Sequence, residues 1–344
     1  MKNKILVGLV LILAFSLFVC GCGSRKGPDS SSQQQKTPVT ITDGKGNQVE
    51  IVCPVDKVIS ITSGASEVIC ALGAEDKIIC RDAKSLLSAS LAKIPEVAES
   101  SYKPNLELII ENNPDVVVAD SMFKDDMREK LEAAGIPVLI YVTSEVETLP
   151  EMIEDLGTVL GKKERAQQLI DFSNKHHDLI KERTAKLTEK EKPQVYYEWN
   201  KPYYSTNASG PAHHRIELAG GINIAANEPV RSPTLTPEWL AEKNPEIIVR
   251  MSSREDSLEQ IKELRQEVMS RPGLSKTTAV QTDKVYLMKW DISSGLRSVI
   301  GSLYFAKWFH PELFADIDPE AIHRELLKKF YNLELEDTYV YPEK

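Results

Sequence analysis

Basic residues are fewer than acidic residues in this sequence. Lys and Arg number 42 against 51 Asp and Glu, which gives a formal net charge of −9 at pH 7. An acidic chain without a basic stripe repels the phosphates of nucleic acid, so we exclude nucleic acid as a partner. The 344 residues, of which 42% are hydrophobic and 27% charged, are otherwise typical of a soluble globular protein with two domains.

Cysteine is also scarce. After the first 25 residues only Cys53, Cys70 and Cys80 occur, and their spacing matches no zinc or redox motif. Cys70 and Cys80 lie in apolar runs, which is typical of small buried side chains. One disulfide among the three is an open alternative, because an odd number of thiols outside the cytoplasm can still form one pair.

Signatures of catalysis are missing as well. The sequence contains no Gly-x-Ser-x-Gly elbow, no Walker loop and no Gly-x-Gly-x-x-Gly after a strand-like run. It has no His-x-x-x-His or carboxylate–histidine set that would indicate a site for a bare metal ion. We therefore expect a protein that is not an enzyme and has no intrinsic cofactor. Two alternatives are a secreted bilobal hydrolase, which would turn over a substrate, and a surface scaffold, whose melting temperature would not respond to ligands.

Long hydrophobic runs are confined to the N-terminus. Lys2 and Lys4 precede a nearly uninterrupted apolar run from Ile5 to Val19. A transmembrane anchor is one interpretation, but the run is short for the ~30 Å hydrocarbon core of a bilayer. The basic start and short apolar centre are typical of a signal peptide, and we expect residues 1–21 to be cleaved.

The end of this run, Val19-Cys20-Gly21-Cys22, resembles a bacterial lipoprotein lipobox. The resemblance implies that Cys22 becomes the first residue of the mature protein and carries a diacylglycerol. Val19 and Cys20 depart mildly from the commoner residues of such a box. Residues 22–37 are polar and low in complexity, which predicts a flexible tether between the lipid and the folded chain.

The most informative feature present is a repeat. The stretch NLELIIENNPDVVV (105–118) aligns without a gap to TPEWLAEKNPEIIV (236–249), with five identities in fourteen positions. Each copy predicts a helix, an Asn-Pro pair that stops it, and a β-branched strand typical of a sheet buried on both faces. Helix, proline and strand follow one another in many α/β proteins, but the ungapped identities favour a duplication that produced two lobes of related build.

Between the two copies lies a span with helical spacing and no strand pattern, residues 148–192. On either side of it strand and helix patterns alternate, which indicates parallel sheets. The predicted fold is therefore α/β, with doubly wound lobes at residues 38–147 and 193–344 and a long connecting helix between them; the second lobe includes a C-terminal extension. In such sheets ligands lie beyond the carboxyl ends of the strands, so we expect a cleft there.

The order of these segments resembles the periplasmic-binding-protein family that serves ABC importers of iron–siderophore, haem and cobalamin complexes. The resemblance covers residues 38–315 and rests on the pieces ITDGKGNQVEI, KVISITSGASEVICALGAEDKI, NLELIIENNPDVVVA, AGIPVLI, LGTVLGKKERA, IELAGGINIAA, LTPEWLAEKNPEIIV, TDKVY and FHPELF. It implies two lobes bridged by a rigid helix, with a metal chelate in the cleft between them. An iron–siderophore complex is the first choice, and cobalamin or haem the alternatives. It also implies a monomer, lipid-anchored on the extracytoplasmic face of the cell membrane, that delivers its ligand to ABC permease subunits with cytoplasmic ATPases.

Aromatic and cationic side chains gather in the loops that we expect at the cleft. Aromatic faces with a few fixed cations suit a large, flat, partly anionic chelate. The predicted cleft residues are Ser63, Ser121, Trp199, Tyr204, His213, Arg231, Met251, Trp290 and Arg297.

Several of these residues have a second interpretation. Trp199 shares a strand face with Tyr197 and could pack in the core. Arg297 matches a recurrent arginine of the family, but it could instead form a structural salt bridge. His213 opens a predicted helix; it could ligate the metal of the chelate, since imidazole binds iron and cobalt, or pack against its own loop.

Glu67 and Glu217 occupy similar places in the two predicted lobes, each on a short helix that ends in glycine. They match family positions, one per lobe, that pair with arginines on the two permease subunits. The resemblance thus implies that they dock the carrier over the pore, where arginine–carboxylate pairs would fix its orientation. Ordinary solvated glutamates are the alternative.

Overall fold

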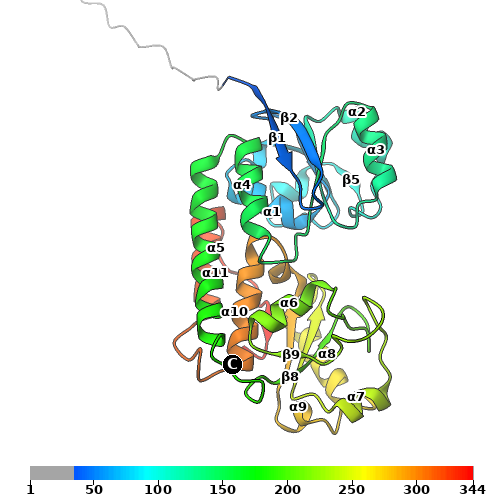
Figure 1. Cartoon of the computed structure of the whole chain (residues 1–344), viewed down its shortest axis with the longest axis vertical. Coiled ribbons are helices and arrows are strands. Elements are labelled where there is room, and N and C mark those ends of the chain that lie inside the picture. The colour runs from blue at the N-terminus through cyan, green and yellow to red at the C-terminus, as the bar shows by residue number, and fades with distance from the viewer. Residues whose placement is uncertain (1–34, 344) are drawn as a thin grey trace, which may run out of the picture. The chain divides into compact units, whose positions relative to one another are not determined.

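The computed structural model describes residues 35–343, which contain two mainly parallel β-sheets flanked by helices (Figure 1). The predicted signal peptide, Cys22 and nearly all of the predicted tether lie outside the described residues. A hairpin of β1 (Thr37–Thr42) and β2 (Gln48–Cys53) precedes the first sheet. Among the helices of residues 35–343, none is long and apolar enough to span a membrane.

The N-terminal lobe contains five parallel strands in the order β5-β4-β3-β6-β7. Its strands are β3 (Val58–Ser60), β4 (Ile78–Asp82), β5 (Glu96–Ala98), β6 (Val116–Asp120) and β7 (Val138–Tyr141). Its helices are α1 (Ser63–Ala71), α2 (Leu106–Asn112) and α3 (Asp125–Ala133). The apolar run of β6 is buried, as expected for an inner strand of a parallel sheet.

The C-terminal lobe contains five strands in the order β12-β11-β10-β8-β9, all parallel except β12. Its strands are β8 (Gln194–Glu198), β9 (Ile222–Asn223), β10 (Ile247–Ser252), β11 (Val285–Lys289) and β12 (Val340–Tyr341). Its helices are α6 (Pro211–Leu218), α7 (Pro237–Lys243), α8 (Leu258–Ser270), α9 (Thr278–Gln281), α10 (Ser298–Phe309) and α11 (Pro319–Leu326). The predicted C-terminal extension supplies β12, which pairs antiparallel with β11 at the sheet edge.

The two sheets share one strand order, as a duplication predicts. β4, β3, β6 and β7 are neighbours in the first sheet, just as β9, β8, β10 and β11 are in the second. The repeated stretch also has the same helix ends in both lobes: Asn105 and Thr236 cap α2 and α7 with side-chain oxygens, and Asn113 and Asn244 end them with φ of 47° and 46°. The predicted fold class is confirmed.

The acidic residue after each Asn-Pro pair has the same role in both copies. Asp115 Oδ2 accepts the backbone N–H of Asp56 at 2.7 Å, just ahead of β3. Glu246 Oε2 accepts the N–H of Gln194, the first residue of β8, at 2.8 Å. Each bond fixes the start of one strand beside its neighbour. Asp115 and Glu246, which occupy matching positions of the repeat, therefore both help to set the register of their strands.

The span predicted as one long connecting helix contains two helices, α4 (Leu149–Val159) and α5 (Lys163–Thr184). The chain turns between them at Gly161, whose φ of +68° is a left-handed conformation that favours glycine. α4 packs against α1 and β2 of the N-terminal lobe. The helical span therefore divides into one helix that belongs to the first lobe and one that connects the lobes.

α5 makes contacts with both lobes. Near its start, Arg165 Nε donates to the Ala71 carbonyl of α1 at 2.9 Å. Near its end, Arg183 Nη2 donates to Asp316 at 2.8 Å, beyond α10. Figure 1 shows α5 running beside α10, against which it packs. The bridging role that the family resemblance implies thus falls to α5 alone.

One buried apolar cluster extends through both lobes. It includes Val58 and Ile69 of the N-terminal lobe together with Ile247 and Leu303 of the C-terminal lobe. The other face of each sheet packs in a separate cluster of its own lobe. Because the apolar cluster is continuous, moving one lobe against the other would expose part of it to water.

Candidate functional site

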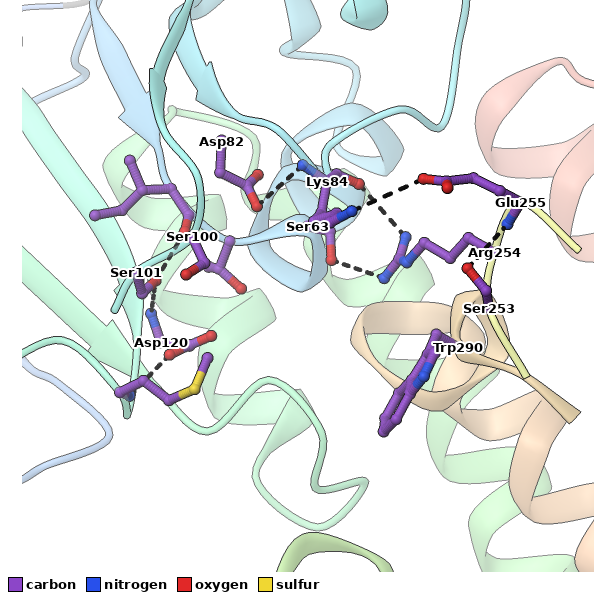
Figure 2. Close-up of a pocket in the computed structure, with 13 residues that line it drawn as sticks. Ser63, Asp82, Lys84, Ser100, Ser101, Asp120, Ser253, Arg254, Glu255 and Trp290 are labelled. Atoms are coloured by element: carbon purple, nitrogen blue, oxygen red, sulfur yellow. Dashed lines mark hydrogen bonds and ion pairs between the residues drawn. The ribbon is translucent and has the colours of Figure 1, made fainter. Parts of the chain in front are cut away.

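A cavity of about 250 Å³ lies at the carboxyl ends of strands from both lobes (Figure 2). The N-terminal lobe contributes residues at the ends of β3, β4, β5 and β6, and the C-terminal lobe contributes residues that follow β10 and β11. This is the edge at which open α/β sheets bind ligands. The lining residues are Ile61, Thr62, Ser63, Asp82, Lys84, Ser100, Ser101, Asp120, Met122, Ser253, Arg254, Glu255 and Trp290.

Hydroxyl groups fix the N-terminal side of the cavity. Ser101 Oγ donates to the Ile61 carbonyl at 2.7 Å and accepts the Asp120 N–H at 2.9 Å, so it ties the end of β3 to the end of β6. Ser85 Oγ donates to Asp82 Oδ1. Burial raises the pKa of Asp82 although this hydroxyl opposes the rise. Burial also raises the pKa of Asp120, and the charge of Asp82 adds to that effect.

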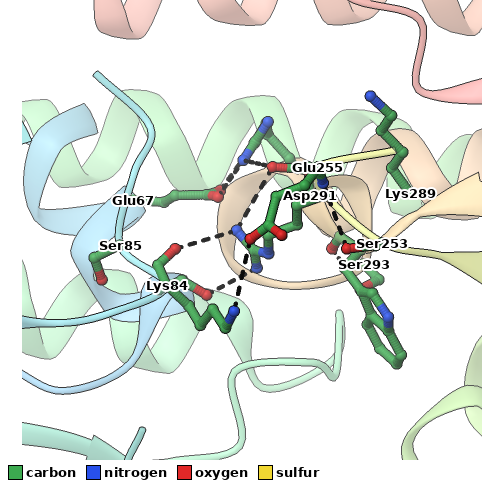
Figure 3. A network of polar contacts seen from close by, with 12 residues as sticks. Glu67, Lys84, Ser85, Ser253, Glu255, Lys289, Asp291 and Ser293 are labelled. Carbon is green, nitrogen blue, oxygen red and sulfur yellow. Dashed lines mark hydrogen bonds and ion pairs between the residues drawn. The ribbon is translucent and has the colours of Figure 1, made fainter. Parts of the chain in front are cut away.

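Arg254 connects the two lobes beside the cavity. Its Nη2 donates to Ser63 Oγ of the N-terminal lobe at 2.9 Å, and its Nη1 lies 3.6 Å from Asp291 Oδ1. A second contact between the lobes joins Lys84 Nζ to Glu255 Oε1 at 3.8 Å. Figure 3 shows Lys84, Glu255 and Asp291 in one polar network. Part of the cavity wall therefore consists of direct contacts between the lobes.

Three aromatic side chains form a group on the C-terminal side. Trp199 stacks on Tyr204 with ring centroids 5.9 Å apart and an interplanar angle of 13°. Trp199 also lies 5.6 Å from Trp290, and of the three only Trp290 lines the cavity. Trp199 and Tyr204 are half-buried, and Trp199 is the ring that contacts Trp290. Ser63 and Trp290 are thus the predicted cleft residues that the structure brings together in the cavity.

Glu67 and Arg297 form an ion pair in the interior. Figure 3 shows Glu67 next to this network. Arg297 Nε donates to Glu67 Oε2 at 3.1 Å, and both side chains are 2% exposed. Burial raises the pKa of Glu67, whereas the guanidinium opposes the rise. The predicted docking role of Glu67 is wrong, because a buried, ion-paired carboxylate cannot reach another protein. Arg297 does not line the cavity either, and forms the structural salt bridge that was its alternative.

The helix that carries Glu217 has a different environment. The Glu217 side chain is 59% exposed and lies 3.3 Å from His213 Nε2. His213 does not line the cavity; it is buried, and its Nδ1 lies 3.5 Å from Asn223 Nδ2, so it packs against its own surroundings as the second interpretation had it. Burial lowers the pKa of His213.

In the part of the chain that the structure describes, no group of three His, Cys, Asp or Glu residues could hold a metal ion.

Three further predicted cleft residues do not line the cavity. Met251 is 1% exposed, because it faces the core cluster from within β10. Arg231 is exposed on the loop before α7, where its carbonyl accepts the Asn207 N–H, and its side chain takes no part in the lining. Ser121 is half-buried between two lining residues without lining the cavity itself. The three described cysteines are buried and free, so no disulfide joins them.

The most polar lining residues were not predicted from the sequence. Asp82 and Asp120 are the last residues of β4 and β6, and Lys84 follows two positions after β4. Arg254 and Glu255 lie just beyond β10, three and four positions after Met251, the residue that the sequence indicated there. The signal that could have found them is the strand end itself, because carboxyl ends of parallel strands share one edge of the sheet.

Comparison with known proteins gives consistent matches over most of the chain. A family model described as periplasmic binding protein matches residues 58–291. The chain is 26% identical over 329 residues to an uncharacterised ABC transporter substrate-binding lipoprotein, YvrC of Bacillus subtilis, which covers 92% of this chain and 100% of that protein.

Solved structures show the same architecture. The TroA-like periplasmic binding protein FepB of Veillonella parvula has a TM-score of 0.75 at 26% identity, over 88% of this chain and 99% of that one. The molybdate-bound MolA of Haemophilus influenzae has a TM-score of 0.75 at 17% identity, over 87% and 100% of the two chains. At that identity the second likeness concerns the fold alone.

Proposed function

Because the chain belongs to the periplasmic binding protein family and is the extracytoplasmic substrate-binding component of an ABC transporter, we propose that it captures a metal chelate in the cavity between its lobes. The members of this family are solute-binding proteins rather than enzymes, and they work with permease and ATPase components. The proposed cargo is an iron–siderophore complex, which the protein would hand to the permease.

The observation that carries the proposal is the convergence of both lobes on one cavity. Trp290 offers an aromatic face from the C-terminal lobe, and the strand ends of the N-terminal lobe offer hydroxyl and carboxylate groups. An aromatic face with a few fixed polar groups is the usual make-up of a small-molecule site. A chelate that contacts both lobes at once would fix their relative position. The surface that the permease contacts would then differ between the loaded and the empty protein.

Cobalamin and haem are the alternative cargoes, because vitamin B12-binding and haem-binding proteins are also similar to this chain. The cavity of about 250 Å³ is below the roughly 300–1,000 Å³ typical of sites for drug-sized ligands. Each of the three chelates would therefore shift the Arg254 and Lys84 contacts between the lobes.

Lipid anchoring through Cys22 belongs to the same proposal, supported by the lipobox-like sequence and by a lipoprotein among the relatives. One modified cysteine would carry the whole anchor. Cys22→Ser should therefore release the protein from membranes. Sedimentation of that variant with membranes after a salt wash would refute the anchor.

Tryptophan fluorescence tests the capture of a chelate. We expect a ferric siderophore to quench the fluorescence of the protein saturably, because Trp290 lines the cavity. Trp290→Phe should remove most of the quenching, and Trp239→Phe, on α7 and outside the lining, should leave it unchanged. No saturable response to a ferric siderophore, cobalamin or haem would contradict the proposal. Quenching by cobalamin or haem alone would replace the siderophore with that ligand.

A further inference from the structure

The cavity that we propose as the binding site contains more negative charge than its own residues neutralise. Its ionisable lining consists of three acids, Asp82, Asp120 and Glu255, and two bases, Lys84 and Arg254. In Figure 2 the two aspartates lie on one side of the pocket, while Arg254 and Glu255 lie on the other. The balance therefore depends on which of these groups are already paired.

Both bases are engaged by acids outside the aspartate side. Lys84 Nζ lies 3.8 Å from Glu255 Oε1. Arg254 lies 3.6 Å from Asp291 and donates to the Ser63 hydroxyl. Neither cation lies within ion-pair distance of Asp82 or Asp120. At longer range the charge of Arg254 opposes the rise in the pKa of Asp82, and the charge of Lys45 opposes the rise in the pKa of Asp120.

Asp82 and Asp120 have only uncharged donors. Within residues 35–343 neither forms an ion pair, since no nitrogen of a Lys, Arg or His lies within 4.0 Å of its carboxylate. Asp82 accepts the Ser85 hydroxyl and the Lys84 N–H at 3.3 Å, and Asp120 accepts the Met122 N–H at 2.8 Å. Asp82 is 2% exposed, and burial raises the pKa of both carboxyls.

Unpaired carboxylates at a sheltered site are costly, and a ligand can reduce that cost. An ammonium group or N–H donor brought by the ligand would restore favourable electrostatics, whereas a second anion would add repulsion at low dielectric. The charge of the site therefore selects among metal chelates by their own net charge.

We infer that the cargo is a neutral or cationic chelate that presents an ammonium group or N–H donors to Asp82 and Asp120. This inference rests on the proposed function. Ferric trihydroxamates are of this class, because three singly charged hydroxamates cancel the charge of Fe³⁺. Ferric tris-catecholates, haem with its propionates, and molybdate are anions. The partly anionic chelate expected from the sequence is thereby replaced, because the cations behind that expectation, Arg231 and Arg297, do not line the cavity.

The test compares chelates that differ in charge, with the full chain and calorimetric titration. Ferrioxamine B, a ferric trihydroxamate with a free ammonium group, should bind at least about tenfold more tightly than a ferric tris-catecholate. Asp120→Asn should weaken ferrioxamine B by about tenfold, the effect of losing one charge-assisted hydrogen bond. The same substitution should weaken binding of N-acetylated ferrioxamine B much less, because that form lacks the ammonium charge. Glu129→Gln, an exposed acid on α3, is the matched control and should change nothing.

The outcomes separate the two proposals. Tightest binding of the tris-catecholate or of haem would overturn the inference about charge and leave chelate capture standing. Equal affinity of wild type and Asp120→Asn for ferrioxamine B would also overturn it, and a melting curve of the variant would show that it is folded. If no chelate binds, or if only molybdate binds, the proposed function itself is refuted and the inference falls with it.

Discussion

Glu67 and Arg297 form a buried ion pair where α1 of the N-terminal lobe meets the turn that precedes α10. Removing one partner leaves the other charged and desolvated, which costs far more than the pair contributes. We predict that Glu67→Ala lowers the free energy of unfolding by about 3–5 kcal/mol. Glu217→Ala, at the equivalent but exposed position, should change it by less than about 0.5 kcal/mol. Urea denaturation measures both, and equal effects of the two variants would contradict the buried pair.

His176 makes folding sensitive to acid. Burial lowers its pKa from 6.5 to about 4, so the folded protein keeps it neutral while the unfolded chain takes up a proton. The stability that this group contributes is complete above pH 6.5 and is lost as the pH falls towards 4, up to about 3 kcal/mol. His323, whose pKa burial lowers to about 3, acts in the same direction.

His176→Leu should therefore flatten the decline of stability between pH 6.5 and 4, while His177→Leu, its more exposed neighbour, should keep the wild-type profile. Denaturation curves at several pH values measure the slope. The account of His176 fails if its replacement leaves that slope unchanged.

At the scale of residues, the sequence indicated candidate residues but not their burial or their partners. Glu67 and Glu217 lie on equivalent helices, and nothing local distinguishes them. The distinction comes from Arg297, which is 230 positions away along the chain from Glu67. Trp290 and Ser63 were predicted because they lie in loops that follow strand-like runs, Trp290 directly after β11 and Ser63 three positions after the end of β3. Asp82 was not predicted, because the apolar pattern of its strand stops at Cys80.

At the scale of elements, close approach of backbone joins the lobes. A Cβ on Gly64 of α1 would lie 3.2 Å from the Gly295 backbone nitrogen, and a Cβ on Gly295 would lie 2.7 Å from the Gly64 carbonyl. The Gly295 N–H donates to the Thr143 carbonyl at 2.8 Å. The lobes are also connected by α5 and by the apolar cluster that extends through both of them. We therefore expect little hinge motion between them.

We therefore predict that ligand binding changes the relation of the lobes only slightly. Small-angle scattering should show a decrease in radius of gyration of less than about 1 Å when a saturating chelate is added. A decrease of several ångströms would contradict the rigid connection. Gly64→Ala, which forces a side chain into the junction, provides a positive control for altered lobe contacts.

Most elements could be predicted because their signals are local. The helix caps of the repeat, the Asn-Pro stops and the β-branched strands are all encoded within a few residues. The break at Gly161 was missed because apolar spacing continues across it, and the left-handed turn there leaves only a glycine as its trace. Which helix of the pair bridges the lobes depends on tertiary contacts of Arg165 and Arg183 that no local pattern contains.

At the scale of the whole molecule, Glu217 remains the proposed contact with the permease, from its exposure and its place in the second lobe. We predict that Glu217→Ala leaves chelate affinity unchanged but reduces ligand-stimulated ATP hydrolysis by the reconstituted importer, because a peripheral charge affects docking rather than the cavity. Glu129→Ala, an exposed acid on the other lobe, should leave hydrolysis unchanged. Full hydrolysis with Glu217→Ala would remove this residue from the docking surface.

The central claim is that cargo sits between the lobes and contacts both. Hydrogen–deuterium exchange of the full chain, with and without a saturating ferric siderophore, tests it most directly. Protection should rise together in loops of both lobes, namely residues 61–63, 82–84, 100–101, 120–122, 253–255 and 290. Protection confined to one lobe, or centred on the hollow between α5 and α6 that His177 and His214 line, would contradict the account.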